Sequence, residues 1–322
     1  MRNRWLIALA AIGLHISIGS VYAWSVLTRP IMTDMGFTMS QTTWTFSLAI
    51  LMLGLSAGFL GSFAEKIGPK KSGLLSMLFW VADLLGTAYA LSIHNLTLLY
   101  LFYGIIGGIG LGIGYITPVS TLVKYFPNRP GFATGLAIMG FGFASLIAGP
   151  LMQFLVAQVG LVNNFIILGV IYLVVMGASS LYLKAPQPKQ PLRTTKDKST
   201  MYVHNHGMLA NDAMKTWQFG ALWWIFFINT CGIGLLSLAS PMAQETIGMT
   251  PAAAASLVGI IGIFNGGGRI AWSTISDYFG RAQTYILFFI IQIIAFYVLA
   301  ETNNTLTFSM AYANSPLFMA AF

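Results

Sequence analysis

Arg269 is the residue whose type and position point most directly to chemistry. It is the single charged residue of the apolar run 252–276 and lies eight residues before Asp277. At about 1.5 Å per helical residue, it would lie about 12 Å from the end of that run, deep in an apolar layer. Its guanidinium is always charged and presents a fork of donors that fits a carboxylate. We interpret Arg269 as an anion-binding residue; a structural pair with a buried acid or backbone carbonyls is the alternative.

Side chains on two helices could complete such a site. Asn265 lies four residues before Arg269, hence on the same helix face, where it could bind the anion or join two helices. The glycines at 266–268 leave room for a ligand or, more simply, for a packed helix. Tyr22 and Trp24 could form an aromatic wall around a small carboxylate, although aromatic residues near helix ends also mark the membrane interface.

Two further residues are candidates for carrying a coupling proton. Asp83 lies twelve residues beyond Lys71 and His15 lies in the first apolar run, so both would be buried. Ionisable groups within a membrane are frequently part of a proton path. A hydrogen-bonded structural role is the alternative for each.

Motifs of enzymes are not found. The glycines between Gly104 and Gly114 lack the spacing and the preceding strand of a dinucleotide site, and they favour close helix packing. His204 and His206 form an H-x-H in a polar stretch without further ligands, and a single cysteine, Cys231, excludes a disulfide framework. The sequence indicates no catalytic residue, no metal, no cofactor and no nucleic-acid partner.

The amino-acid composition indicates that this chain lies in a membrane and not in water. Of its 322 residues, 57% are hydrophobic and 7% are charged, whereas soluble domains carry about 25% charged residues. So few charges cannot cover a water-exposed surface. We therefore predict an all-α integral membrane protein with the lipid bilayer as its main partner.

Apolar runs long enough to cross the membrane occur nine times, and a tenth is still running at Phe322. A spanning helix needs about 20 residues, and unbroken runs favour helices over barrel strands. The predicted spans are 5–28, 44–63, 72–93, 97–123, 131–157, 164–183, 219–243, 252–276 and 284–300, with the tenth from 305.

The loop charges predict an orientation and a division. If the N-terminus is cytoplasmic, 14 of the 16 Lys and Arg residues lie at inner ends, as the positive-inside rule requires. The basic, proline-containing stretch is the candidate linker. We predict a six-helix N-terminal bundle at 1–184, a cytoplasmic linker at 185–218 and an incomplete C-terminal bundle at 219–322.

The two parts resemble each other in sequence. Glu65-Lys-Ile-Gly68 matches Asp277-Tyr-Phe-Gly280, and Gly36 and Thr38 match Gly248 and Thr250 at the same offset along the chain. Parallel repeats of this kind build a large class of transporters, with the substrate site near the midplane between them.

The motifs at these positions resemble those of one family. The stretch 61–71, GSFAEKIGPKK, resembles the loop signature of the major facilitator superfamily, with Glu65 where Asp is usual. Tyr22-Ala-Trp24-Ser, the stretch 112–127 and the segments 265–269 and 276–281 resemble its oxalate:formate antiporter and monocarboxylate transporter branch. Members have twelve helices, so the chain resembles a member truncated after about nine and a half.

The resemblance implies roles for the motif residues. Arg269 would hold the substrate carboxylate, and the loop motif would act as a cytoplasmic latch between rocking halves. Tyr115 would line the cavity; a structural hydrogen bond of its hydroxyl is the alternative. The latch residues are Gly61, Glu65, Lys66, Gly68, Lys70 and Lys71, with a second copy at Asp277, Gly280 and Arg281.

The expected function is therefore secondary active transport of small carboxylates across the cell membrane. A truncated, inactive membrane protein and an anion channel or uniporter are the alternatives. The residues leave open the choice among oxalate, formate, lactate and pyruvate, the choice between exchange and proton symport, and the oligomeric state.

Overall fold

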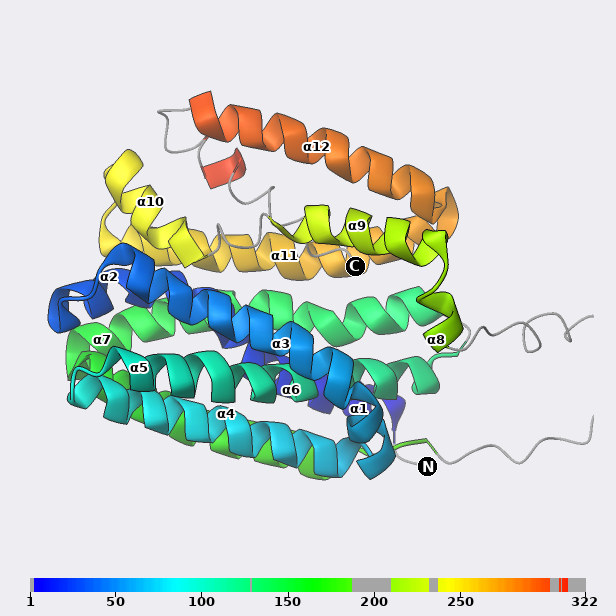
Figure 1. Cartoon of the computed structure of the whole chain (residues 1–322), viewed down its shortest axis with the longest axis horizontal. Helices are drawn as coiled ribbons and strands as arrows, with labels where there is room; N and C mark the ends of the chain where they lie inside the picture. Colours follow the sequence, from blue (N-terminus) through cyan, green and yellow to red (C-terminus); the bar gives the residue numbers. More distant parts are fainter. Residues whose placement is uncertain are drawn as a thin grey trace, which may run out of the picture.

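The described elements of the protein are all helices. A computed structural model describes residues 3–127, 129–186, 210–231, 237–301, 307 and 309–311. The helices lie roughly along one axis of the molecule (Figure 1). Their bounds are α1 Arg4–Gly19, the 3-10 turn η1 Ser20–Ala23, α2 Trp24–Met35, α3 Met39–Ile67, α4 Pro69–Ser92, α5 Leu96–Leu99, the π-helical η2 Tyr100–Gly107, α6 Gly108–Tyr125, α7 Pro130–Tyr182, α8 Ala210–Ala213, α9 Trp217–Cys231, α10 Ala239–Thr246, α11 Pro251–Phe279 and α12 Arg281–Glu301.

Seven helical stretches of the described chain are long and apolar enough to span a membrane. The first is the continuous run of α1, η1 and α2. The fifth and sixth predicted spans are not separated by a loop: both lie in α7, which is interrupted only at Gly160 (φ 83°, ψ 169°). The seventh corresponds to α9 and α10, and the tenth lies mostly outside the described residues.

Helix ends repeat the sequence similarity in three dimensions. Gly36 and Gly248 have φ of 70° and 72°, and Gly68 and Gly280 have φ of 82° and 88°. These left-handed conformations favour glycine, which lacks a Cβ atom. Thr38 and Thr250 both cap the following helix by accepting a backbone N–H bond with the side-chain oxygen. Local geometry thus recurs at the positions that the sequence repeat pairs.

Packing brings the C-terminal helices against the N-terminal ones along α7. The core of the N-terminal helices contains Trp24, Trp80, Tyr103 and Phe165, all fully buried. The first part of α7 packs against α11, and α2 packs against α10 (Figure 1). The predicted linker lies largely outside the described residues, so the division at 185–218 stays a prediction.

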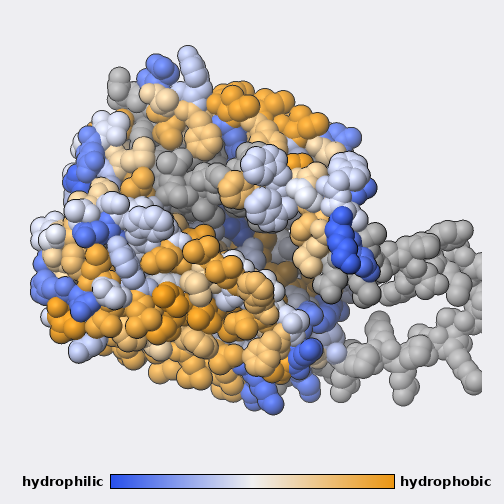
Figure 2. All heavy atoms as spheres, in the orientation of Figure 1, coloured by the Kyte–Doolittle hydropathy of each residue, from blue (hydrophilic) through white to orange (hydrophobic). Residues whose placement is uncertain are grey.

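The surface is apolar around the middle of the bundle. Figure 2 shows hydrophobic side chains gathered over α3 and α4, with hydrophilic ones at both ends. Phe59 on α3 is 79% exposed, and Leu78 and Tyr89 on α4 are also exposed. Such a surface contacts lipid, because each apolar side chain would be costly in water. The protein is a multi-pass membrane protein.

Candidate functional site: a buried arginine where α7 meets α11

Glycines hold α7 and α11 together at the seam between the two sets of helices. A Cβ atom on Gly142 of α7 would lie 2.5 Å from the backbone nitrogen of Gly266, and one on Gly262 of α11 would lie 2.3 Å from the Ser145 hydroxyl. No real side chain tolerates such distances, so the backbones approach as closely as glycine permits. Gly267, by contrast, has no atom within 4 Å of its would-be Cβ.

Arg269 extends from this seam into the interior and is 4% exposed. Its Nε donates a hydrogen bond to Asn265 Oδ1 at 3.0 Å, one turn earlier on α11. Its guanidinium carbon lies 5.8 Å from the centre of the Phe141 ring, within cation–π range. No carboxylate of a described side chain lies within ion-pair distance of it. The charge is therefore buried beside the Asn265 amide, the Phe141 ring face and the Tyr22 hydroxyl.

The Phe141 ring on α7 is the meeting point of the site. It contacts Tyr22 at 4.8 Å, Tyr115 at 5.5 Å and His15 at 6.1 Å, measured between ring centres. Tyr22 and His15 also interact electrostatically with Arg269. Five helical segments, α1, η1, α6, α7 and α11, thus bring aromatic or ionisable side chains to one point. Phe141 was not among the predicted residues, since a phenylalanine in an apolar run carries no local signal.

A narrow crevice lies between the two sets of helices next to Asn265, the hydrogen-bond partner of Arg269. Tyr22 and Asn265, both predicted, line it from opposite sides of the seam. The 3-10 turn η1 carries Tyr22 and interrupts the α-helix at this level. Its other lining residues are Ser145, Ala239, Val258 and Ile261.

Trp24 lies away from the crevice, in the core of the N-terminal helices. Its ring packs on Tyr103 at 4.2 Å between centres, and its indole N–H donates to the Thr42 carbonyl at 3.3 Å. Asp83 is also buried in that core, where Oδ1 accepts a bond from Thr87 at 3.1 Å. Its Oδ2 has no hydrogen-bond partner among the described atoms. Neither residue lines the crevice that Tyr22 and Asn265 share.

The predicted latch residues lie at the opposite end of the helices from the α2–α10 contact. Glu65 at the end of α3 pairs with Lys124 of α6 at 3.3 Å, and both are exposed. A Cβ atom on Gly61 would meet Ile116 of α6 at 3.0 Å. The Asp277 and Arg281 side chains lie outside the described part. The remaining latch positions are Lys66, Lys70 and Lys71, which are all exposed, and Gly68 and Gly280, which have positive φ.

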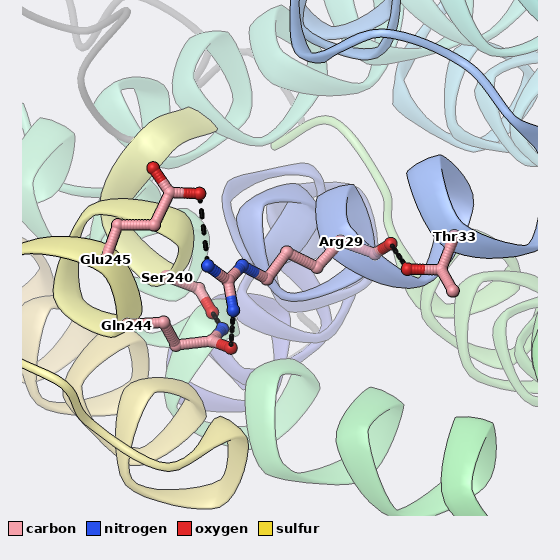
Figure 3. Close-up of polar contacts among 5 residues, drawn as sticks. All are labelled: Arg29, Thr33, Ser240, Gln244 and Glu245. Atoms are coloured by element: carbon pink, nitrogen blue, oxygen red, sulfur yellow. Dashed lines mark hydrogen bonds and ion pairs between the residues drawn. The ribbon is translucent and has the colours of Figure 1, made fainter.

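A charged contact at the other end joins α2 to α10. Arg29 donates to Glu245 Oε1 and to Gln244 Oε1, each at 3.1 Å (Figure 3). Gln244 in turn donates to the Ser240 hydroxyl at 3.0 Å. The partners of Arg29 belong to the other set of helices, so this contact could not be predicted from the spacing of residues along one helix.

A multi-pass helical bundle with a buried cation at the seam of two helix sets has the architecture of a secondary transporter. The chain belongs to the Major Facilitator Superfamily, whose family profile matches residues 7–322. It is therefore a membrane transporter and not an enzyme, which confirms the family predicted from the loop motifs.

Two proteins with similar sequences are also named as transporters. The chain is 30% identical over 319 residues to "Uncharacterized MFS-type transporter YhjX" of Escherichia coli, covering 97% of this chain and 76% of that protein. It is 27% identical over 294 residues to the oxalate:formate antiporter of Oxalobacter formigenes, covering 89% of this chain and 66% of that protein.

A solved structure shares the fold. It is a bacterial homologue of the human lysosomal transporter Spinster, in an inward-facing and unoccupied conformation. The TM-score is 0.69 with 16% identity, and the match covers 100% of this chain and 74% of that one.

Proposed function

We propose that this protein transports a small carboxylate and that Arg269 binds the carboxylate group. The observation that carries the proposal is the burial of the Arg269 guanidinium with no described acid beside it. A buried charge without a counterion is costly, and an anionic ligand would remove that cost. The similarity to an oxalate:formate antiporter supports a carboxylate as that anion.

The neighbours of Arg269 favour a small ligand. Asn265 occupies the Arg269 Nε and thereby orients the guanidinium. Tyr22 and Asn265 line a crevice that is narrow and otherwise mostly apolar. In this conformation the crevice is too narrow to hold a water molecule, so a small anion would enter it only as the two sets of helices part, with hydroxyl and amide groups beside its oxygens. We assign Tyr22, Tyr115, Asn265 and Arg269 to the binding site and leave Trp24 to the core.

Transport would proceed by alternating access, with the two sets of helices rocking about the α7–α11 seam. The charge asymmetry of the loops supports a cytoplasmic N-terminus in the cell membrane. In that orientation the Arg29–Glu245 contact closes the outer end, and the Glu65–Lys124 pair lies at the inner end.

Uptake of radiolabelled formate, oxalate, lactate and pyruvate into proteoliposomes tests the proposal. Counterflow against each unlabelled anion should identify a substrate of the wild-type chain. Arg269→Gln should lower that uptake by about 30-fold or more, because losing a buried charge pair costs about 2–5 kcal/mol. Arg269→Lys should restore it only in part, since an ammonium lacks the fork.

Lys215→Gln is the matched control, because it removes an exposed cation that pairs only locally with Asp212. It should leave uptake unchanged. Uptake that survives Arg269→Gln would refute the role of Arg269. Anion flux without counterflow would indicate a channel or uniporter, and no flux of any of the four anions in the wild type would contradict carboxylate transport by this chain.

A further inference from the structure

His15 lies at the junction of three helices and is fully buried on α1. Its Nδ1 lies 2.5 Å from the carbonyl oxygen of Ala137 on α7. Its Nε2 lies 3.0 Å from the carbonyl oxygen of Tyr115 on α6. Both ring nitrogens therefore face an acceptor that can never donate.

This arrangement suits only one protonation state completely. A neutral imidazole carries one N–H, so its second nitrogen would place a lone pair against a carbonyl lone pair. An imidazolium donates from both nitrogens and satisfies both carbonyls. One backbone carbonyl on α6 and one on α7 are thus placed to accept hydrogen bonds from the protonated ring.

The charges around His15 oppose that state when the site is empty. Arg269 of α11 acts on the ring with a like charge. The other side chains facing it are the Tyr115 phenol from α6, at 5.5 Å between ring centres, and the Phe141 ring from α7. Among the described residues no carboxylate interacts with His15. A proton on His15 would therefore leave two buried cations without a counterion.

We propose that His15 is the proton-binding residue of this transporter and takes up its proton together with the carboxylate that binds Arg269. This inference rests on the proposed function. The anion supplies the counter-charge that the pair His15 and Arg269 lacks, so each ligand strengthens binding of the other by the same factor. The proton comes from water on one side and returns to water on the other, with only the N–H bond formed and broken.

Asp83, the other candidate, is placed less well for this coupling. Its carboxyl interacts with Thr87 and with Tyr103 in the core of the N-terminal helices. Neither of these partners lines the crevice next to Asn265. A proton on Asp83 would therefore lie beside Thr87 and Tyr103 and not beside the side chains assigned to anion binding.

Uptake driven by a pH gradient tests the inference. Inward acid gradients should accelerate wild-type uptake of formate or lactate by at least about fivefold, the lower end of usual coupling factors. His15→Gln should lose this acceleration and show weaker but still measurable counterflow. His94→Gln is the matched control, because His94 is exposed in the turn after α4, and it should retain both.

Acceleration that persists in His15→Gln, or its absence in a wild type with counterflow, would overturn the inference and leave the proposed function standing. A wild type without counterflow would instead contradict the proposed function itself. The two failures are therefore distinguishable.

A second measurement covers the case in which His15→Gln does not fold. Replacing His94, His204 and His206 by Gln leaves His15 as the one histidine. Nitrogen-15 NMR of the labelled ring, with and without formate, should show both nitrogens protonated only when formate is bound. A ring that stays neutral with saturating formate, or is protonated equally without it, would refute the coupling.

Discussion

The Arg29 guanidinium and the Glu245 carboxylate lie 3.1 Å apart and join α2 to α10 (Figure 3). The two residues come from the two sets of helices that meet at the α7–α11 seam. Their side chains are 41% and 57% exposed, so water screens the pair. Exposed ion pairs contribute roughly 0.2–1 kcal/mol, which would suit a contact that breaks during the proposed alternating access.

Removing this pair should shift the protein toward a state open at the α2–α10 end. We expect Arg29→Gln to raise the rate at which an impermeant thiol reagent modifies Ser145→Cys from that end, in a chain with Cys231 replaced by Ser. The increase should be up to about fivefold, matching an ion pair of at most about 1 kcal/mol. The double exchange Arg29→Glu with Glu245→Arg should restore the slow rate. A rate unaffected by Arg29→Gln would show that the contact does not hold the end closed.

The glycine contact between α7 and α11 should be sensitive to a single methyl group. Gly142→Ala would place a Cβ atom 2.5 Å from the Gly266 nitrogen and 2.7 Å from Asn265 Oδ1. The helices must then separate, and we expect a loss of about 1–3 kcal/mol in stability together with weaker carboxylate binding. Thermal unfolding in detergent measures the first effect. Gly267→Ala, which meets no atom within 4 Å, is the control, and equal unfolding temperatures for the two variants would contradict the packing.

Gly160 should be required at the kink of α7. Its φ of 83° and ψ of 169° lie in a region that is nearly exclusive to glycine. Gly160→Ala should therefore lower the free energy of unfolding by about 1–3 kcal/mol. Gly58→Ala, at an open position within α3, should be neutral or slightly stabilising in the same unfolding assay. If Gly160→Ala were as stable as Gly58→Ala, the kink would not depend on the positive φ that favours glycine at position 160.

Asp83→Asn should leave both stability and proton-driven uptake close to those of the wild type. No described cation lies within ion-pair distance of Asp83, so the amide removes no ion pair. The amide oxygen can still accept the Thr87 hydrogen bond that Oδ1 receives. We expect a change below about 1 kcal/mol in unfolding and full acceleration of uptake by an acid gradient. Loss of that acceleration with counterflow intact would transfer the proton-binding role from His15 to Asp83.

The sequence alone determined the features that depend on local spacing. Apolar runs predicted the spanning helices, and the constant offset between the two repeats predicted matching helix ends, which Thr38 and Thr250 cap in the same way. It also predicted that Arg269 is buried, because a lone cation within such a run has no water to reach. The sequence also placed Asn265 beside Arg269, because residues four apart lie on the same face of a helix.

Only the tertiary structure decided which distant side chains meet. Phe141 became the centre of the site because α1, α6 and α11 pack around α7 at its level. His15 reached the carbonyls of two other helices, while Trp24, two residues after Tyr22, turned into the core instead. Apolar runs of similar composition can pack in many registers. The register therefore depends on close contacts such as Gly142 against Gly266, which appear only when whole helices are assembled.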